Sequence, residues 1–568
     1  MNQLNRRIFM AALGATALAS GVAGRALAQA TGSAAPAGGA ARPNILLILA
    51  DDMGWSDIAP FGAAEIATPT LDALAADGTR LTNFHVSPFC SPTRAMLLTG
   101  QDNHQIGLGN MIELIAPEQK GQPGYEGHLN DRAVTIAQRL KEAGYRTMMA
   151  GKWHLGLDEA HSPAAWGFDR SFAMMRGEAN HYPYQGKAPS PDGPDLYRED
   201  GKETGLPADF YSTDGFVGHL NAYLDEVPQG TPFFAYLAFT APHSPLQAPA
   251  ALIAKYKGRY DAGPAALAEA RMARMKELGL IPTDAKPHAM IEQKDWAALP
   301  AEDRAAWSRR MEIYAAMIDS MDAGIGRVMD KLREKGAADN TLVVFLSDNG
   351  AAGALREGNP KWGPWIKDNF DNSLDNMGTG TSYLSTGSDW AQASMAPFAL
   401  FKGFTTEGGT LSPVIMAGPG IAKGGISGRF GEVKDIAPTL LTLAGVDPAA
   451  PAGKAPVTGA DMLPALARPD ATQVGPDRPM VMELVGGRAV HKGDWKAVLI
   501  TSRPSGLKPE GVATRKWQLY NLANDPGETT DLAAEQPQVL AELAQAYDAW
   551  AKENGVISLP GMFEDIIR

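Results

Sequence analysis

The sequence predicts an α/β protein in which a large, mostly parallel sheet flanked by helices precedes a smaller C-terminal α+β domain. Two observations predict the large sheet: short apolar runs without alternation, which are typical of strands buried on both faces, and helical stretches between these runs. A third observation predicts the small domain, because the runs near the C-terminus alternate apolar and polar residues and are separated by glycine turns.

The N-terminal segment is expected to direct export. Residues 1–28 have a basic start, an apolar run and a small-residue cleavage pattern, which together predict a signal peptide. The Arg6-Arg7 pair favours the twin-arginine route, so we expect a periplasmic or secreted protein. The apolar run is shorter than the ~20 residues that span a bilayer, so no stable membrane anchor is expected. Residues 29–42, rich in Ala, Gly and Pro, are expected to form a flexible linker.

The remaining chain divides into two predicted domains, residues 43–456 and 457–568, at a proline-rich stretch. The buried strands of the first domain are predicted from the apolar runs 44–52, 147–151, 232–243 and 341–350, and its helices from 131–144 and 304–335. In the second domain an antiparallel sheet is predicted from 481–500 and 516–522, and an amphipathic helix from 534–555.

The composition is acidic and contains one cysteine. The net charge of −13 becomes −16 when the three arginines of the predicted signal peptide are removed. Such a charge disfavours nucleic acids and anionic membranes as partners. Because Cys90 is the only cysteine, no internal disulfide can form. This residue is therefore a core thiol, a reactive group or a residue that is converted into another.

Polar residues follow each predicted strand. Asp51-Asp52, Lys152 with His154, His243 and Asp348-Asn349 stand at the ends of the four runs. Singly, such residues are often only turns or caps. Together they predict a ligand site, because the carboxyl ends of the strands of an open α/β sheet meet at one edge. The carboxylate and amide oxygens are ligands that suit Ca²⁺ or Mg²⁺.

The stretch FCSPTRAMLLTG, residues 89–100, predicts a nucleophile at an anion site. Pro92 suits the first turn of a helix that continues to about Leu98, so Cys90 lies where free backbone N–H groups favour an anion, and Arg94 adds a fixed cation. A helix N-terminus and an arginine both lower the pKa of a thiol, which favours a reactive thiolate. A thiolate nucleophile, however, has no evident need of a neighbouring cation site.

These residues resemble the type I sulfatases of the alkaline phosphatase superfamily, and most closely the bacterial arylsulfatases. The pattern C-x-P-x-R, an apolar pair and T-G is matched from Cys90 to Gly100, and a second pattern is matched by GYRTMMAGKWH, residues 144–154. The resemblance extends from about Asn44 into the C-terminal domain. It implies the fold of that superfamily and the hydrolysis of sulfate monoesters to an alcohol or phenol and inorganic sulfate.

The resemblance also implies a role for each residue. A formylglycine-generating enzyme would oxidise Cys90 to Cα-formylglycine, whose hydrate, a geminal diol, is the nucleophile. The implied ligands of one divalent cation, usually Ca²⁺ with Mg²⁺ as the alternative, are Asp51, Asp52, Asp348, Asn349 and the modified Cys90. Arg94 would hold the modified residue and His154 would contact its second hydroxyl; Asp348 would act as base or orienter. The implied sulfate-binding and leaving-group residues are Lys152, His243 and Lys402.

Physical reasoning supports this assignment. A cation with Lys152, Lys402 and Arg94 would neutralise the negative charge of a sulfate ester. One hydroxyl of a diol can carry sulfate while the other is deprotonated, so that the aldehyde returns; a sulfated serine has no second hydroxyl and would be trapped. Phe89 is larger than expected before the cysteine, which bears on the fit to the modifying enzyme.

Two other functions stay open at this point. The same scaffold could hydrolyse phosphonate or phosphate esters, or the protein could be a catalytically silent calcium- or anion-binding protein in which Cys90 stays a thiol. The alcohol would be chosen by loops at about 105–130 and 170–215, and aryl, alkyl and sugar sulfates all remain open. The aromatic residues Trp153, Trp166, Tyr182 and Tyr184 are expected to pack loops over the core rather than to line an aryl pocket.

Overall fold

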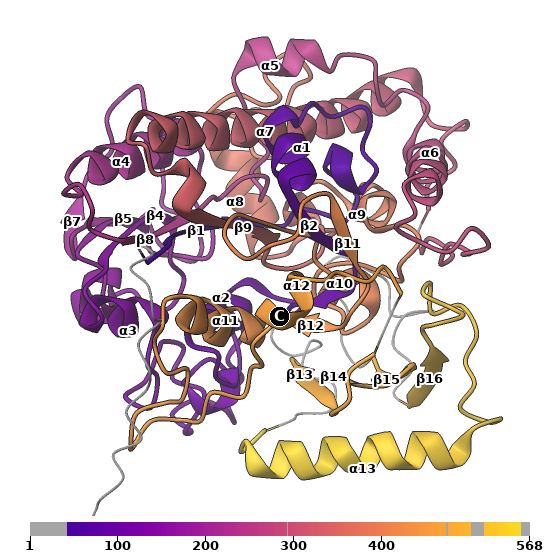
Figure 1. Ribbon diagram of the computed structural model, residues 1–568. Helices are drawn as coiled ribbons and strands as arrows, with labels where there is room; N and C mark the ends of the chain where they lie inside the picture. Colours follow the sequence, from indigo (N-terminus) through magenta and orange to yellow (C-terminus); the bar gives the residue numbers. More distant parts are fainter. Residues whose placement is uncertain (1–41, 292, 473–474, 501–515, 558–568) are drawn as a thin grey trace, which may run out of the picture. The chain divides into compact units, whose positions relative to one another are not determined.

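A ten-stranded mixed sheet forms the centre of the molecule (Figure 1). The computed structural model describes residues 42–291, 293–472, 475–500 and 516–557, so the predicted signal peptide and nearly all of the predicted linker lie outside the described residues. The strand order is β11-β2-β10-β9-β1-β8-β4-β5-β6-β7. The strands are β1 (Asn44–Ala50), β2 (Gly78–Leu81), β4 (Arg146–Lys152), β5 (Arg170–Met174), β6 (Tyr197–Glu199), β7 (Lys202–Thr204), β8 (Phe233–Ala238), β9 (Thr341–Ser347), β10 (Val414–Ala417) and β11 (Gly425–Ser427).

The five central strands β9, β1, β8, β4 and β5 are parallel, as the sequence predicts, and Leu47 of β1 lies between Tyr236 and Val344 of its neighbours. Every residue of β1 is buried because the sheet is covered on both faces. Leu46 and Ile48 belong to one apolar core, whereas the alternate residues of β1 belong to the other. The four apolar runs therefore lack alternation because their strands are buried on both faces, as predicted.

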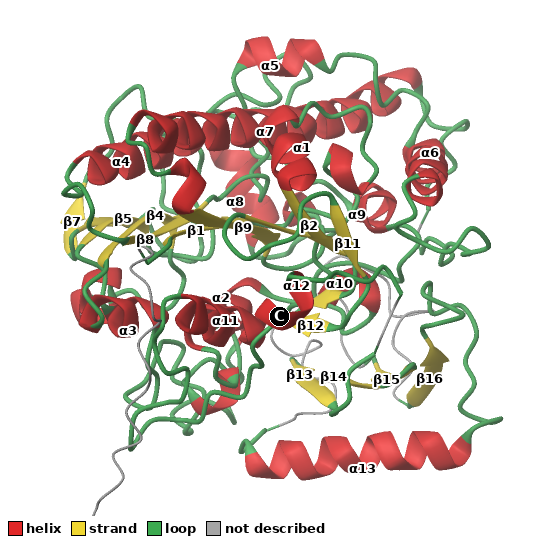
Figure 2. Ribbon diagram, in the orientation of Figure 1, coloured by secondary structure: helices red, strands yellow, loops and turns green. Residues whose placement is uncertain are grey.

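Helices form a layer on each side of this sheet (Figure 2). One layer contains α1 (Pro69–Asp77), α4 (Ser212–Asp225) and α7 (Ala301–Glu334), and the other contains α2 (Cys90–Thr99), α3 (Ile136–Glu142) and α11 (Ile436–Leu443). The remaining helices are α5 (Ala250–Lys255), α6 (Pro264–Glu277), α8 (Trp362–Asn369), α9 (Ser388–Met395), α10 (Glu407–Thr410) and α12 (Leu463–Leu466).

The predicted elements differ from the observed ones mainly at their ends. The helix predicted at 131–144 begins only at Ile136, because the Thr135 hydroxyl and the Gln138 side chain form a capping box there. The helix predicted to start near Pro92 includes Cys90 as its first residue, preceded by Phe89 in an extended conformation. The run predicted as a strand at 232–243 leaves the sheet after Ala238, so His243 lies on the loop beyond the strand end.

A separate antiparallel sheet near the C-terminus confirms the α+β part of the predicted fold. Its strands pair in sequence order, and α13 (Pro537–Glu553) packs on one face through Leu543 and Tyr547. On the other face, Ala489 and Val498 join the apolar core of the main sheet. The strands are β13 (Met480–Leu484), β14 (Gly487–Lys492), β15 (Trp495–Leu499) and β16 (Trp517–Asn521); a further parallel pair is formed by β3 (Phe84–His85) and β12 (Gly431–Glu432).

Among the described residues, no helix combines the length and apolar character needed to cross a membrane. The division of the chain into domains at residue 457 stays a prediction.

Candidate active site

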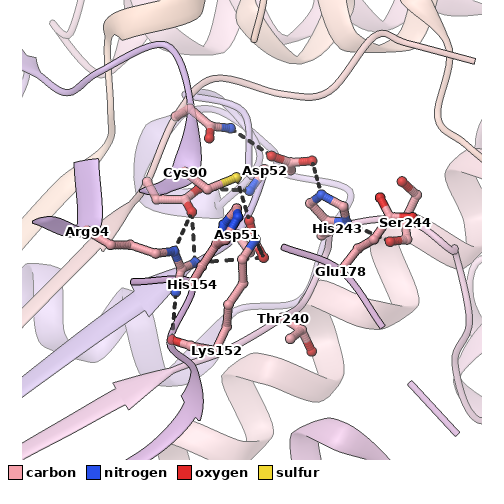
Figure 3. A network of polar contacts seen from close by, with 12 residues as sticks. Asp51, Asp52, Cys90, Arg94, Lys152, His154, Glu178, Thr240, His243 and Ser244 are labelled. Atoms are coloured by element: carbon pink, nitrogen blue, oxygen red, sulfur yellow. Dashed lines mark hydrogen bonds and ion pairs between the residues drawn. The ribbon is translucent and has the colours of Figure 1, made fainter. Parts of the chain in front are cut away.

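The residues predicted to form the site meet beyond the carboxyl ends of the parallel strands (Figure 3). The register that pairs Ala50 of β1 with Ser347 of β9 places the residues that follow, Asp51 and Asp348, next to each other. Lys152 is the last residue of β4, two strands away from β1. The parallel pairing of the strands thus explains why residues almost 300 positions apart in the sequence share one site.

Buried carboxylates form the centre of the site. Asp51 and Asp52 are at most 1% exposed. Asp51 accepts hydrogen bonds from the Cys90 thiol at 3.6 Å and from Lys152 Nζ at 2.6 Å, and Asp52 Oδ1 accepts one from Asn349 Nδ2 at 2.7 Å. Asp52 also has a φ of 65°, a strained conformation for a residue with a side chain, of the kind that persists where surrounding contacts impose it.

The donor atoms of this group fit a hard cation. Ligand atoms of Asp51, Asp52, Cys90 and His243 all lie within 4.8 Å of one another. Asp52 Oδ2 and Asn349 Oδ1 are buried and have no hydrogen-bond partner among the described residues. A buried oxygen without a partner is costly, and a bound Ca²⁺ or Mg²⁺ would satisfy both oxygens. The other implied ligand, Asp348, lies adjacent and accepts the Asp52 backbone N–H at 3.2 Å.

Three cations surround these acids. Arg94 donates from Nε and Nη2 to Asp348 Oδ2 at 3.0 and 2.7 Å, and from Nη1 to the Lys152 carbonyl at 3.0 Å. Lys402 Nζ lies 2.5 Å from Asp52 Oδ1 and 3.2 Å from Cys90 Sγ. Burial alone would lower the pKa of Lys402, but the negative charge of Asp52 outweighs it and raises this pKa above its ordinary value. Burial alone would also lower the pKa of Lys152, but the negative charge of Asp51 outweighs it, so the pKa of Lys152 is raised as well.

Cys90 is 2% exposed and lies at the N-terminus of α2. Burial raises the pKa of its thiol to about 12, although Lys152 and Lys402 act in the opposite direction. Burial therefore disfavours the reactive thiolate that was one of the possibilities open from the sequence, because the cost of burying a charge outweighs the effect of the nearby cations. The unmodified side chain is a neutral thiol at neutral pH.

Two histidines line the same site with different partners. His243 Nδ1 lies 2.6 Å from the Ser244 carbonyl, which assigns the proton to Nδ1 in the neutral ring, and Nε2 faces Asp52 Oδ2 at 3.4 Å. Burial lowers the pKa of His243 to about 3. His154 Nε2 lies 3.2 Å from both carboxylate oxygens of Glu113, and its buried Nδ1 has no partner among the described residues.

Comparisons with known proteins agree with this site. The profile of the family described as Sulfatase matches residues 43–446. An uncharacterized sulfatase of Schizosaccharomyces pombe is 42% identical over 543 residues, which cover 92% of this chain and 96% of that protein. An arylsulfatase of Klebsiella aerogenes is 43% identical over 427 residues, which cover 73% of this chain and 89% of that protein. The chain belongs to the sulfatase family.

Solved structures share the fold. The crystal structure of Ps i-CgsB in complex with k-i-k-neocarrahexaose superposes with a TM-score of 0.64 at 24% identity, over 92% of this chain and 94% of that one. A phosphonate monoester hydrolase of Agrobacterium radiobacter does so with a TM-score of 0.54 at 20% identity, over 90% and 96% of the two chains. The family and the relatives assign this chain to the sulfuric ester hydrolases; the arrangement of its strands is shared more widely.

In this sulfatase a cavity of about 250 Å³ opens above the charged residues. Cys90, Asp52 and Lys402 are at its base together with His154 and His243. Its walls are partly apolar, and the apolar side chains that line it include Phe89, Met111, Leu114 and Trp362. The aromatic residues singled out from the sequence, Trp153, Trp166, Tyr182 and Tyr184, do not line this cavity.

The walls come from three loop regions, of which the sequence predicted two. The stretches predicted at about 105–130 and 170–215 supply Glu113 and Glu178. The third region, residues 352–362, was missed, although it follows β9 and Asn349 closely enough that its place at the same sheet edge could have been inferred. It is fixed to the second loop by Arg356, whose Nη2 donates to Glu178 Oε2 at 2.7 Å. Tyr383 donates to the other oxygen of Glu178 at 2.5 Å.

Proposed function

We propose that this sulfatase is an exported arylsulfatase that hydrolyses sulfate monoesters with a formylglycine made from Cys90 and one bound divalent cation. One observation carries the proposal: Cys90, buried at the start of α2, lies within contact of both a carboxylate of the acidic group, Asp51, and a charged lysine, Lys402. A protein that only bound an anion or calcium would have no need of a modifiable residue at this point.

The cation would be held by Asp51, Asp52, Asp348, Asn349 and residue 90. Support comes from the oxygen donors and from the buried, unpartnered oxygens of Asp52 and Asn349. Ca²⁺ is the first choice because carboxylate and amide oxygens suit it, and Mg²⁺ is the alternative. When bound, the cation supplies positive charge that offsets the negative charge of the ester and lowers the pKa of a neighbouring hydroxyl.

The residues of the chain supply the nucleophile, bind the sulfate and transfer protons. Oxidised to formylglycine by a formylglycine-generating enzyme, residue 90 supplies the nucleophilic hydroxyl and a second hydroxyl that permits release of sulfate. Lys152 and Lys402 hold the sulfate oxygens by charge, and Arg94 fixes Asp348 at the nucleophile. Lys402 gives a proton to the departing oxygen, because the neutral ring of His243 has its only proton on Nδ1, directed at the Ser244 carbonyl. His154, with an unpartnered Nδ1, accepts a proton from residue 90.

The apolar part of the cavity supports an aryl alcohol as the leaving group. Phe89, Met111, Leu114 and Trp362 provide apolar surface above a base that is charged. An aromatic ring buries its faces on such surface. The similarity to the Klebsiella arylsulfatase points in the same direction.

Turnover of paired substrates tests the reaction class. The purified protein, produced with the modifying enzyme present, is assayed with 4-nitrophenyl sulfate and with an aryl phosphonate monoester at saturating Ca²⁺. We expect the higher kcat/KM on the sulfate. A higher value on the phosphonate would replace the proposed function with phosphonate ester hydrolysis.

The mass of the peptide that contains Cys90 tests the modification. We expect the mass of an aldehyde in protein made with the modifying enzyme, and a free thiol in protein made without it. Finding only the thiol in active enzyme would overturn the formylglycine mechanism.

Export is tested by cell fractionation. We expect periplasmic activity that is lost when Arg6 and Arg7 are both replaced by lysine. Activity that stays in the periplasm of this variant would argue against the twin-arginine route.

A further inference from the structure

Five buried titratable residues outside the cavity form a second ionic group, here called the Glu407 cluster. They are at most 3% exposed and come from β3, α10, β14, β15 and the segment after β16: His85, Glu407, His491, Lys496 and Glu528. None of them lines the cavity above Cys90. The reaction proposed above uses none of them.

Glu407 is held from the two-stranded sheet and from the C-terminal sheet. Its carboxylate oxygens each lie 3.1 Å from His85 Nε2, and Lys496 Nζ of the C-terminal sheet donates to Oε1 at 2.6 Å. Its backbone N–H donates to Glu528 Oε2 at 2.8 Å. Lys496 also pairs with Glu528 at 3.3 Å, and the ring of His491 packs edge-on against His85. Because Lys496 touches both glutamates, it joins the C-terminal sheet to α10.

Glu407 in turn fixes the loop that carries Lys402. The Thr406 hydroxyl and the Gly408 N–H both donate to the Ala399 carbonyl, at 2.7 and 2.8 Å, so the loop closes on itself around Lys402. A Cβ at Gly408 would lie 2.2 Å from the Leu400 carbonyl, which leaves no room for another side chain in this turn. A shift of Glu407 therefore moves the loop as a unit.

The same cluster contacts the segment that leads to Cys90. The chain runs from His85 through residues 86–89 directly into α2, and the Val86 N–H donates to the Thr410 carbonyl of α10 at 2.7 Å. The Gly403 N–H donates to the Pro88 carbonyl at 3.0 Å. The Lys402 loop and the Cys90 segment are thus both anchored beside the cluster, and their side chains meet at 3.2 Å.

We propose that Lys496 is a positioning residue for the hydrolysis: by holding Glu407 it places Lys402 Nζ at the nucleophile and the sulfate. Stability alone does not require such a group, because apolar residues of similar volume replace buried ion pairs at little or no cost in many proteins. Directional contacts to His85, Lys496 and Glu528 fix Glu407 more narrowly than an apolar contact would. The inference rests on the proposed function in one respect, the action of Lys402 on the sulfate ester.

The test is Lys496→Met, assayed with 4-nitrophenyl sulfate, which has a good leaving group, and with phenyl sulfate, which has a poor one. We expect kcat to fall by about 10- to 100-fold, because small misplacements of a catalytic group have effects of this size. We expect kcat to fall more for phenyl sulfate than for 4-nitrophenyl sulfate, and we expect the same difference between the two substrates in Lys402→Ala. Lys434→Met is the matched control, because Lys434 is also a buried lysine and is paired with Glu432. Its second contact, Asp102, lies beyond the C-terminal end of α2, whereas Cys90 is at the N-terminal end. This control leaves the ratio of the two kcat values unchanged.

The double variant Lys402→Ala with Lys496→Met decides whether the effect passes through Lys402. If it does, Lys496→Met lowers kcat no further once Lys402 is absent. Equal losses in both backgrounds, or a folded Lys496→Met protein with the kcat values of the wild type, overturn the proposal. If Lys496→Met does not fold, Glu407→Gln replaces it, because this variant weakens the same ion pair from the side of Glu407. We expect Glu407→Gln to change the ratio of the kcat values for the two substrates. A wild-type protein that turns over neither sulfate contradicts the proposed function instead.

Discussion

The base and the walls of the cavity are built in different ways. The base consists of charged side chains that follow buried parallel strands or begin a buried helix. Asp51, Asp348 and Lys152 lie behind the side chains that line the cavity, are 0% exposed and complete the base. The walls consist of loops, and they carry apolar side chains such as Met111 and Leu114. This contrast suggests that the base determines the reaction and the walls determine the alcohol.

The difference also concerns rigidity. Side chains at the base are fixed by ion pairs of 2.6 to 2.7 Å between segments far apart in the sequence, such as Lys152 with Asp51 and Arg94 with Asp348. The walls are joined to one another by ion pairs that are more exposed to solvent, such as Arg356 with Glu178 and Lys361 with Asp192. Changes at the base should therefore lower kcat, whereas changes in the walls should alter KM.

Cys90→Ser should have the largest effect. Serine can accept sulfate but lacks the second hydroxyl that releases it, so we expect steady-state turnover to fall on the order of 10⁴-fold or more. Intact mass spectrometry after incubation with substrate should show one covalently bound sulfo group per chain. Cys90→Ala is the control, because it cannot be sulfated; a rate close to that of the wild type in either variant would contradict the assignment of the nucleophile.

Removal of the cation should rank second. Treatment with a chelator is expected to lower kcat by about 10³-fold, since a bound metal supplies several kcal/mol of charge stabilisation. Ca²⁺ at ~100 times its Kd should restore activity and stabilise the folded protein by about 2.7 kcal/mol, measured as a rise in Tm. Asn349→Ala should reduce this rise in Tm. Full activity in the chelator-treated, metal-free enzyme would exclude the proposed cation site.

Lys402→Ala should lower kcat by ~10²- to 10³-fold, because one preorganised charge is lost at the reacting group. The exposed Lys367 of α8 provides the control, and Lys367→Ala should leave kcat unchanged. Steady-state kinetics at saturating substrate measure both. A change confined to KM would mean that Lys402 contributes to binding rather than to the chemical step.

Met111→Ala tests the walls. Loss of part of the apolar lining should raise KM for aryl sulfates by about 3- to 10-fold and leave kcat within about twofold. Competitive inhibition by inorganic sulfate should not change, since sulfate contacts only the base. If inhibition by sulfate weakened as well, the separation of base and walls would be wrong.

Glu113→Gln should have the smallest effect and tests a contact between wall and base. Burial alone would raise the pKa of Glu113, but the charge of His154 outweighs it and lowers this pKa from 4.5 to about 2. The stability contributed by a carboxyl with a lowered pKa is present above pH 4.5 and is lost as the pH falls toward 2. Above pH 4.5, and up to the pH at which His154 loses its proton, the variant should be less stable by ~1 kcal/mol; the difference should vanish toward pH 2 in thermal unfolding scans. A difference that does not depend on pH would exclude the ion pair.

The base of the cavity could be predicted from the sequence because its chemistry follows local patterns. Asp51, Lys152 and Asp348 each stand after an apolar run, and parallel pairing brings the ends of such runs together. Lys402 has no such pattern around it and was assigned only through the resemblance to known sulfatases. The structure brings it to Cys90 by closure of the loop before α10.

Two of the three wall loops were predicted, but the side-chain contacts of the walls and the Glu407 cluster could not be, since they join segments without regular structure or far apart in the chain. Glu113 meets His154 across 41 positions, and Lys496 meets Glu407 across 89. A glutamate on a short turn or a lysine in an exposed-looking strand carries no local sign of such a partner. The alternation of β15 predicts one buried face, but the strand buries three consecutive residues, Lys496, Ala497 and Val498, and one of these is a charged lysine.

Under the proposed function, the burial of Cys90 requires that this residue be oxidised to formylglycine before the chain folds. A small ester reaches a side chain that is 2% exposed at the base of a cavity, but another enzyme, which must surround several residues of its substrate, does not. We therefore expect a chain that folds before it is oxidised to remain inactive permanently. The fraction of active molecules then depends on the rate of oxidation relative to the rate of folding during synthesis. Slower translation, or a variant that folds more slowly, should therefore raise the yield of active enzyme per chain.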